Sequence, residues 1–206
     1  MAHEVRAALL LSKLAKVIYI SSDAVFAENL PIITEQTLPC PDTLYGIMHL
    51  AREKILEEVC RSQNIPLLIL RSCAIFGPGD THNSYGPNRF LRSAISEKKI
   101  KLFGRGEEMR PHIYIGDIVN LIQQAAVSDA SGVFHAIPSP SLSFCEVAEQ
   151  VVSLKSVNAE LEFLPRSGQP THKHFKSVRL GELFPSFEFR SFRAALAEQL
   201  EIEKWH

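Results

Sequence analysis

The sequence lacks several features that would assign it to whole classes of protein. Its 22 Lys and Arg residues are balanced by 23 Asp and Glu, so no excess of positive charge favours nucleic acid or an anionic membrane. Its apolar runs all fall short of the roughly 18 residues that a membrane-spanning helix needs. The short apolar patch at residues 7–11 is broken by Ser12 and Lys13, and no signal-peptide cleavage site follows it. We therefore expect a cytoplasmic protein that binds neither nucleic acid nor membranes.

Clustered metal ligands and paired cysteines are also missing. The four cysteines have no C-x-x-C spacing, which argues against a disulfide framework or a zinc site. His172 and His174 would share one face of a strand, but no acidic or cysteine ligand is near them in the sequence. We expect no metal. The cysteines are Cys40, Cys60, Cys73 and Cys145.

The sequence does have the composition of an ordinary globular protein, with 46% hydrophobic and 22% charged residues over 206 positions. Apolar spacing predicts a buried helix over 3–15 and a second helix over 45–60. Short apolar runs predict buried strands at 17–20 and 65–71, and prolines predict a loop over 27–43. Strand, helix and strand in this order form a βαβ unit, hence a parallel sheet.

Further helices and strands alternate through the rest of the chain. Asp117 is the predicted N-cap of a helix that runs to about residue 127, and Ser143 with Glu146 forms a predicted capping box. The remaining predicted elements are helices over 89–97 and 191–201, and strands at 100–103, 113–115, 133–137 and 161–164.

The helix over 45–60 is predicted to be amphipathic. Its apolar residues are spaced to share one face, and most of its charged residues lie opposite. The expected inner face carries Ile47, Ala51, Ile55 and Val59, and the outer face carries Arg52, Glu53, Glu57 and Glu58.

Two hydroxyls and a carboxylate end the strand at 17–20, as Ser21-Ser22-Asp23, and the next helix opens with Tyr45. His49 lies one helical turn after Tyr45, on the same face. This combination resembles the extended short-chain dehydrogenase/reductases, the NAD-dependent sugar epimerase/dehydratase family. There a strand ends in Ser-Ser/Thr and the next helix begins with Tyr-x-x-x-Lys. His49 stands at the lysine position.

The resemblance implies catalytic roles for four residues. Ser22 would orient a sugar hydroxyl, and Tyr45 would act as its general acid/base. Tyr45 and His49 would also contact NAD, because the family lysine binds the nicotinamide ribose. His49 has an ordinary pKa near 6.5 and is expected to be mostly neutral at pH 7, so it would activate Tyr45 weakly. Asp23 stands where sugar dehydratases carry an acid, although Ala24 replaces the glutamate that usually follows.

A substrate side is implied by the same resemblance. Residues 70–79 resemble the family's passage from a strand into a Gly-Pro-Gly loop, with Ala74 in place of the asparagine that contacts the diphosphate. Phe103 matches an aromatic residue near the nucleotide base, and Arg110 matches a phosphate-binding arginine. Arg166 approximately matches a second one. Plainer roles stay open for these three: Phe103 as core, and the arginines as solvated charges.

A glycine-rich turn for the NAD pyrophosphate is absent, because no glycine precedes Gly46. By comparison with the family, we expect about a hundred N-terminal residues to be missing. The predicted fold class is therefore α/β: an incomplete Rossmann-like parallel sheet, its second half only, with a small α/β substrate-binding domain. The expected sheet domain covers 1–76 and 111–137. The expected substrate domain covers 77–110 and 138–206.

Two hypotheses for function follow. The first is an NAD-dependent epimerase/dehydratase-type oxidoreductase or isomerase acting on a nucleotide-linked sugar, truncated so that this chain alone is inactive. The second is a non-catalytic relative that binds a sugar nucleotide or a protein and has lost the cofactor loop and the lysine. The resemblance also implies a homodimer through the helices at 3–15 and 45–60.

Overall fold

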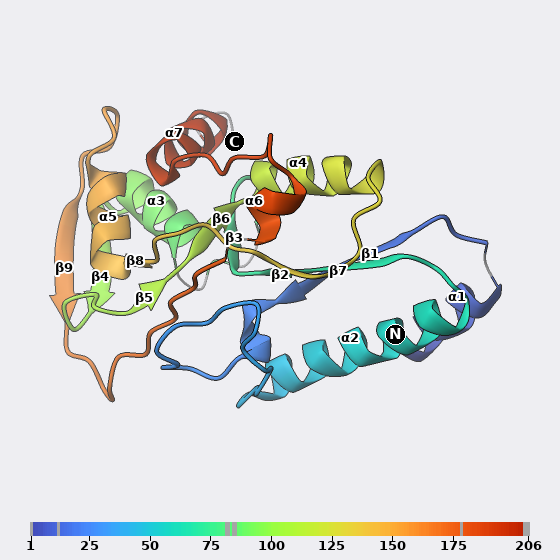
Figure 1. The fold of residues 1–206 in the computed structure, drawn as a ribbon. Coiled ribbons are helices and arrows are strands. Elements are labelled where there is room, and N and C mark those ends of the chain that lie inside the picture. Colours follow the sequence, from blue (N-terminus) through green and yellow to red (C-terminus); the bar gives the residue numbers. More distant parts are fainter. Residues whose placement is uncertain (1, 12, 81–82, 84–85, 178, 204–206) are drawn as a thin grey trace.

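A central three-stranded sheet organises the chain (Figure 1). The computed structural model describes residues 2–11, 13–80, 83, 86–177 and 179–203. Strands β1 (Val17–Ser22), β2 (Leu67–Ser72) and β7 (Gly132–Ala136) run parallel in the order β1–β2–β7. The middle strand is the most apolar and the most deeply buried, as expected for a parallel strand covered on both faces. The predicted parallel α/β fold is confirmed.

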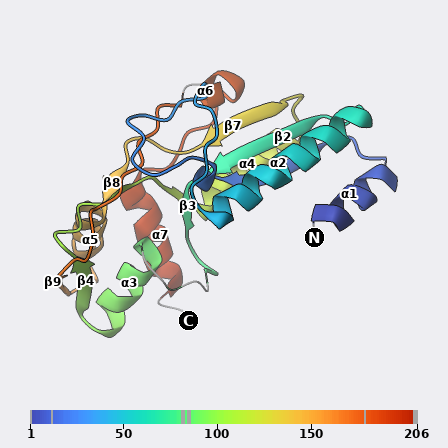
Figure 2. The same ribbon diagram turned by 90° about the horizontal axis from the view of Figure 1, so that it is seen from below.

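Helices cover both faces of this sheet (Figures 1 and 2). Helix α2 (Leu44–Ser62) lies along one face, with α1 (Ala2–Leu11) beside it. Helix α4 (Ile115–Ala126) and the short helix α6 (Arg179–Leu183) lie on the opposite side. This arrangement leaves β1 at one edge of the sheet and brings the head of α2 to the carboxyl end of the strands.

Helix α1 differs from its prediction. It ends at Leu11, four residues earlier than expected, and residue 12 lies outside the described part of the chain. Leu9 is buried, but Leu11 and Leu14 are exposed. The helix packs against α2. The expectation of a buried helix is therefore wrong.

The inward face of α2 also differs from its prediction. Ile47 and Ala51 are exposed, whereas Glu53 is fully buried. Apolar residues occur on two sides of this helix, and the sheet covers only one of them. The buried positions are Gly46, Glu53, Leu56, Val59 and Cys60.

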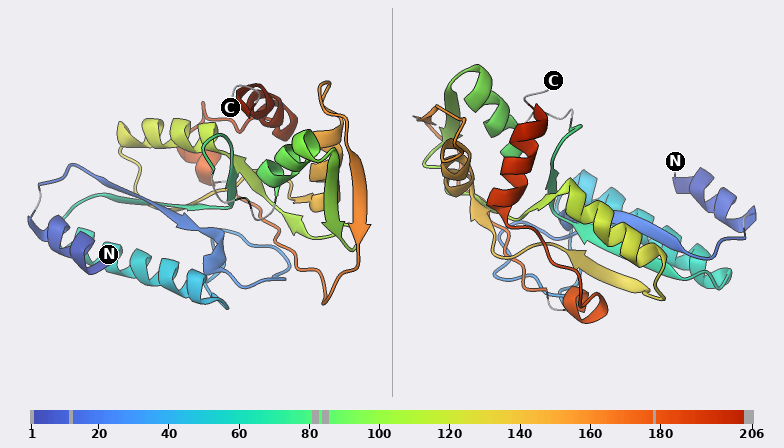
Figure 3. Two further views of the ribbon diagram at one scale, coloured as in Figure 1. Left: turned by 180° about the vertical axis from the view of Figure 1, so that it is seen from behind. Right: turned by 90° about the horizontal axis from the view of Figure 1, so that it is seen from above.

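A second group of elements lies beyond the carboxyl end of the sheet (Figure 3). Helices α3 (Pro87–Ser96), α5 (Phe144–Val152) and α7 (Phe192–Glu203) pack around the parallel pair β4 (Lys99–Phe103) and β9 (Glu160–Leu164). The capping box at α5 is confirmed, since Ser143 N donates to Glu146 Oε2 at 2.7 Å and Glu146 N to Ser143 Oγ at 3.1 Å.

Four short strands connect the two groups, and one of them lies where the sequence predicted a strand, at 113–115. Strand β3 (Ala74–Phe76) pairs with β6 (His112–Tyr114), and β5 (Met109–Arg110) pairs with β8 (Leu142–Ser143). The other three strands have only two or three residues, too few to show a period, so only their partners identify them.

The prediction that Asp117 is the N-cap of α4 is wrong, because Tyr114 occupies that position. Asp117 lies in the first turn and is buried. Its Oδ2 accepts a hydrogen bond from Arg190 N at 3.0 Å. The carboxylate therefore anchors the C-terminal segment to the start of the helix.

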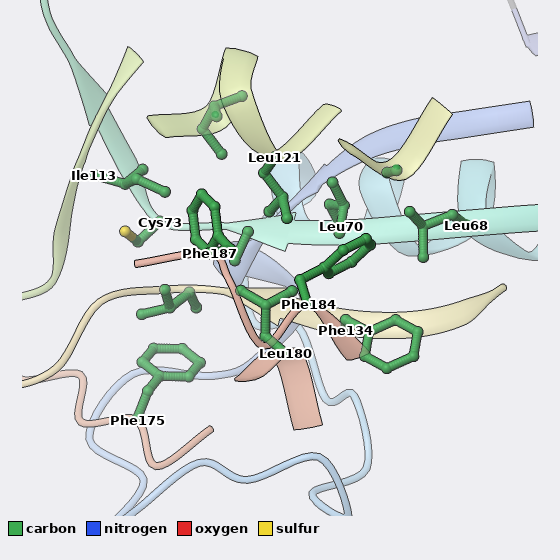
Figure 4. Close-up of a cluster of buried hydrophobic side chains, with 14 of the residues drawn as sticks. Leu68, Leu70, Cys73, Ile113, Leu121, Phe134, Phe175, Leu180, Phe184 and Phe187 are labelled. Carbon is green, nitrogen blue, oxygen red and sulfur yellow. The ribbon is translucent and has the colours of Figure 1, made fainter. Parts of the chain in front are cut away.

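The main hydrophobic core lies between the sheet and α4 (Figure 4). Leu68 and Leu70 of β2 meet Leu121 of α4 there, and Phe175 and Phe184 enter from the C-terminal segment. A second core fills the space among β4, α3, α5 and α7. The division into a sheet domain and a substrate domain stays a prediction, and part of 138–206 packs into the first core.

Candidate active site

The carboxyl end of β1 holds Ser22 in a defined position. Its Oγ accepts a hydrogen bond from Ala24 N at 3.1 Å and donates to Asp23 Oδ1 at 3.3 Å. The serine thereby caps η1 (Asp23–Val25), the short 3-10 helix that turns the chain out of the sheet. Capping and a role in a site are compatible, because a hydroxyl can accept a second hydrogen bond.

The head of α2 is pressed against this turn. A Cβ atom at Gly46 would lie 1.9 Å from the carbonyl oxygen of Ala24, so only glycine allows the approach. Thr43 Oγ1 caps the helix by accepting from Gly46 N at 3.1 Å. The neighbouring Tyr45 is thus brought to the end of β1, with 61% of its surface exposed.

His49 interacts with two tyrosines. Its ring lies edge-on to that of Tyr45, with 4.6 Å between the centroids. Its Nδ1 is 3.1 Å from the hydroxyl of Tyr19 on β1. Burial, with the nearby positive charge of Arg52, lowers the pKa of His49 below its ordinary value of 6.5. The imidazole is therefore neutral at pH 7 and does not provide the charge of a lysine.

A cleft with a volume of about 740 Å³ opens at this end of the sheet. Five of the seven predicted site residues line it: Ser22, Asp23, Tyr45, His49 and Arg110. Its wall also includes Ser72, which ends β2, and Ala74, which replaces the family's asparagine. Ligands of parallel α/β sheets bind at the carboxyl ends of the strands, so the cleft is at the expected place.

Asp23 faces a lysine that the sequence did not indicate. Lys173 Nζ donates to the carbonyl oxygen of Asp23 at 3.1 Å and lies 3.7 Å from its Oδ2. Burial raises the pKa of Asp23, and the charge of Lys173 opposes part of that rise. The carboxyl group can therefore hold a proton at a higher pH than an exposed aspartate.

Arg110 is tied to the cleft wall. It donates to the carbonyl oxygen of Thr171 at 2.7 Å and lies 3.0 Å from Glu28 Oε2. It is thus a held cation at the edge of the cleft and not a solvated charge. Phosphate binding by Arg110 stays a prediction.

Phe103 and Arg166 lie together but do not line the cleft. Arg166 Nη2 donates to the carbonyl oxygen of Phe103 at 3.0 Å and contacts Glu108 at 3.3 Å. The side chain of Phe103 is 58% exposed, so it is not a core residue. Their predicted roles at the nucleotide stay predictions.

His172 and His174 stack on each other, with 6.1 Å between ring centroids. His172 Nδ1 accepts a hydrogen bond from Met109 N at 3.3 Å. In the part of the chain that the structure describes, no three His, Cys, Asp or Glu side chains gather as a metal site would need.

A buried charge pair behind the cleft escaped the sequence analysis. Glu53, expected on the outer face of α2, accepts from Arg71 Nη2 at 2.7 Å, from Arg71 Nε at 3.0 Å and from Ser21 Oγ at 2.5 Å. Tyr45, His49 and Glu53 follow one another at four-residue spacing and share one helix face, but the spacing alone does not show that Glu53 is buried.

Lys173 is identified by the structure and not by the sequence. The segment around it alternates, with Lys173 and Phe175 buried and the two flanking histidines less so. Alternation of this kind is typical of an extended strand. Of these residues, it is the lysine between the two histidines that lines the cleft.

Comparison with known proteins agrees with this geometry. The model of the NAD dependent epimerase/dehydratase family matches residues 1–136. A dTDP-L-rhamnose 4-epimerase from Burkholderia thailandensis is 34% identical over 96 residues, which are 45% of this chain and 26% of that protein. The uncharacterised UDP-glucose epimerase YtcB of Bacillus subtilis is 28% identical over 102 residues, 50% of this chain and 32% of that protein. The chain spans about a quarter to a half of the length of the curated relatives it matches.

Two solved structures have the same fold. A UDP-glucose 4-epimerase from Thermotoga maritima, in complex with UDP-glucose, superposes with a TM-score of 0.88 at 20% identity, over 99% of this chain and 68% of that one. A UDP-glucuronic acid 4-epimerase from Bacillus cereus, in complex with UDP-glucuronic acid and NAD, gives 0.85 at 22% identity, over 100% and 67%.

Proposed function

Because the chain belongs to the NAD-dependent epimerase/dehydratase family, we propose that its cleft binds a nucleotide-linked sugar and that Tyr45 and Ser22 handle a hydroxyl proton of that sugar. The observation that supports this proposal is the cleft itself. It gathers a serine, a tyrosine, a histidine, an acid and an arginine from separate parts of the chain at the carboxyl ends of β1 and β2.

Each residue has a proposed role. Ser22 orients the sugar hydroxyl, and Tyr45 takes up and returns its proton as general acid/base. Asp23 is placed to exchange a proton with the sugar, because burial favours its protonated form. Arg110 holds phosphate oxygens. Phe103 and Arg166 contact the nucleotide, which would have to extend beyond the cleft to reach them.

NAD is the proposed cofactor, and the residues of this chain fit only one end of it. Tyr45 and His49 are exposed to the cleft and could hold the nicotinamide ribose by hydrogen bonds. The sequence contains no glycine-rich turn that could cradle the pyrophosphate. When bound, NAD supplies hydride transfer at the sugar. We expect the chain alone to bind it weakly, and a micromolar dissociation constant by calorimetry would contradict this.

Binding of UDP-glucose tests the proposed function directly. Calorimetry should detect binding to the chain, and Arg110→Met should weaken it about ten- to hundredfold, the usual value of a hydrogen bond to a charged group. Arg193→Met is the matched control, because Arg193 also donates to the carbonyl and hydroxyl of one residue, Ser153, but lies outside the cleft. Absence of binding, or equal effects of the two substitutions, would overturn the proposal.

Turnover separates catalysis from binding alone. If the site is catalytic, adding NAD should give slow conversion of the sugar that Tyr45→Phe abolishes, while UDP-glucose still binds. The neutral His49 and the absent asparagine at Ala74 favour a non-catalytic, sugar-nucleotide-binding relative instead. Binding without any turnover, even with NAD at saturating concentration, would support that alternative.

A homodimer through α1 and α2 is also part of the proposal. The two helices pack against each other, and exposed apolar side chains line their outer surface. Such a surface is typical of an association site. Light scattering after size-exclusion chromatography should give twice the monomer mass, and a monomer at high concentration would contradict the dimer. The exposed residues include Leu10, Leu11, Leu44, Ile47 and Met48.

None of the described helices combines the length and the apolar character that crossing a bilayer requires. The cysteines are free thiols, which supports the proposed cytoplasmic location.

A further inference from the structure

We propose that Arg110 and Lys173 form a two-cation anion site in the cleft, and that Glu28 occupies it in place of an anionic group of the ligand. This inference rests on the proposed function, since it concerns how the same cleft takes a nucleotide-linked sugar.

One carboxylate bridges two cations in this part of the cleft. Glu28 Oε2 lies 3.0 Å from Arg110 Nη2, and Glu28 Oε1 lies 3.4 Å from Lys173 Nζ. All three residues line the cleft. A phosphate or a carboxylate of a ligand has the same charge sign and oxygen acceptors, so it can make the same two contacts.

The two cations are fixed. The side chain of Lys173 is only 5% exposed, and its backbone is held by a bond from its N to the carbonyl oxygen of Met109 and one from Ser141 Oγ to its own carbonyl oxygen. Arg110 donates to the backbone of Thr171. A buried lysine is rare unless it is paired, so Lys173 needs anionic partners at this place.

The anion between them is held less well. Glu28 Oε2 is buried but accepts no hydrogen bond within the described ranges, although it is close to Arg110. The side chain of Glu28 is 31% exposed, and it belongs to the long loop before α2. Rotation of this side chain into solvent would free the site, while the hydrogen bond from Glu28 N to Asp42 Oδ2 keeps the backbone in place.

Charge balance favours exchange of one anion for another. Arg110 and Lys173 face the carboxyl groups of Asp23 and Glu28. If Glu28 leaves and a ligand anion enters, the balance is kept, and no buried cation loses its partner. A neutral ligand would displace Glu28 without replacing its charge. Glu28 therefore sets a preference for anionic ligands and lowers their affinity by competing with them.

Glu28→Gln tests the competition, because it removes the charge and keeps the shape. If Glu28 occupies the site in about nine molecules of ten, its removal should tighten ligand binding about tenfold. The matched control is Glu162→Gln. Glu162 is 38% exposed and lies 3.5 Å from Lys99 Nζ, at a pair outside the cleft. The Glu162→Gln substitution should leave the affinity for the ligand unchanged.

Three ligands distinguish the two sources of the anion. If the diphosphate enters the site, Glu28→Gln increases the affinity for UDP, UDP-glucose and UDP-glucuronic acid alike. If a sugar carboxylate enters the site, only the affinity for UDP-glucuronic acid increases. Unchanged affinity for all three, in a chain that binds UDP-glucose, overturns this inference and leaves the proposed function standing. If neither the wild type nor Glu28→Gln binds any of the three, both are wrong.

Lys173 requires its own variants. Lys173→Met should weaken binding about thirtyfold, equivalent to about 2 kcal/mol. The double variant with Glu28→Gln removes both partners, so its thermal stability should recover towards the wild type while binding stays weak. If Lys173 only supports the fold, the double variant binds as tightly as Glu28→Gln alone, and that result would overturn the assignment.

Discussion

Two clusters of charge lie near the carboxyl end of the central sheet, and they differ in how completely their hydrogen bonds are made. In the first, Glu53 on α2 is fully buried and both of its carboxylate oxygens accept bonds, from Arg71 and Ser21. In the second, Glu28 reaches Arg110 and Lys173 from a loop and is partly exposed, and one of its oxygens accepts no hydrogen bond from the described residues.

The difference supports a structural role for the first cluster and the proposed binding role for the second. The Glu53 cluster joins α2 to β1 and β2, and both carboxylate oxygens of Glu53 already accept hydrogen bonds within it. The cluster around Glu28 lines the cleft and has cations that a second anion could use. Charge burial alone would have ranked the first cluster as the better site. Completeness of hydrogen bonding reverses that ranking.

Loss of the Glu53 cluster should have the largest effect on stability. Glu53→Gln leaves the buried Arg71 without a counter-charge, and breaking such a pair costs about 3–5 kcal/mol of unfolding free energy. Urea unfolding measures it. Glu57→Gln on the same helix is the control, since Glu57 pairs with Lys54 at the surface, and should cost less than about 1 kcal/mol. Equal losses would show that the Glu53 cluster is not the structural one.

The stability of the fold should be sensitive to acid because of two buried histidines, one in the sheet core and one at the cleft. His135 lies edge-on to Phe26 in the sheet core, and His112 lines the cleft. Burial lowers the pKa of each from 6.5 to about 4. Both are therefore neutral in the folded state over a range in which the unfolded chain binds protons.

Because the unfolded chain binds these protons first, the unfolding free energy falls as the pH drops from about 6.5 to about 4. The loss is up to about 1.4 kcal/mol per pH unit for each histidine. His135→Phe should flatten this dependence by one histidine's share, and so should His112→Phe. Unfolding in urea at pH 7, 6 and 5 measures it, with His174→Gln as control. Asp23, whose pKa is raised, also contributes to the pH dependence, but it is present in all variants and so does not affect the comparison among them. An unchanged slope in both Phe variants would contradict the burial argument.

The cluster around Glu28 should contribute least to stability. Glu28→Gln should change the unfolding free energy by less than about 1 kcal/mol, because the side chain is partly exposed and one oxygen makes no hydrogen bond. The same urea titration applies. A loss of about 3 kcal/mol or more would mean that Glu28 holds the fold together, as Glu53 does, and the contrast between the two clusters would disappear.

The local elements and the end of the sheet that carries the proposed site follow from the sequence. The strand ending at Ser22, the helix that begins near Tyr45 and the capping box at Ser143 were predicted, and all three are present. Their signals lie within one element: a run of apolar residues, a helical period, a cap three residues from its partner. The separation of 23 residues between Ser22 and Tyr45 also carried the family resemblance.

Only the tertiary structure decided which faces are buried and which charges meet. Glu53 was assigned to the outer face of α2 because helical periodicity cannot show which of two apolar sides the sheet covers. Lys173 and Asp23 are 150 residues apart, and no spacing in the sequence connects them. The cleft depends on such contacts between distant segments, which form because the packed cores bring those segments together, whereas helices and strands depend on neighbours along the chain.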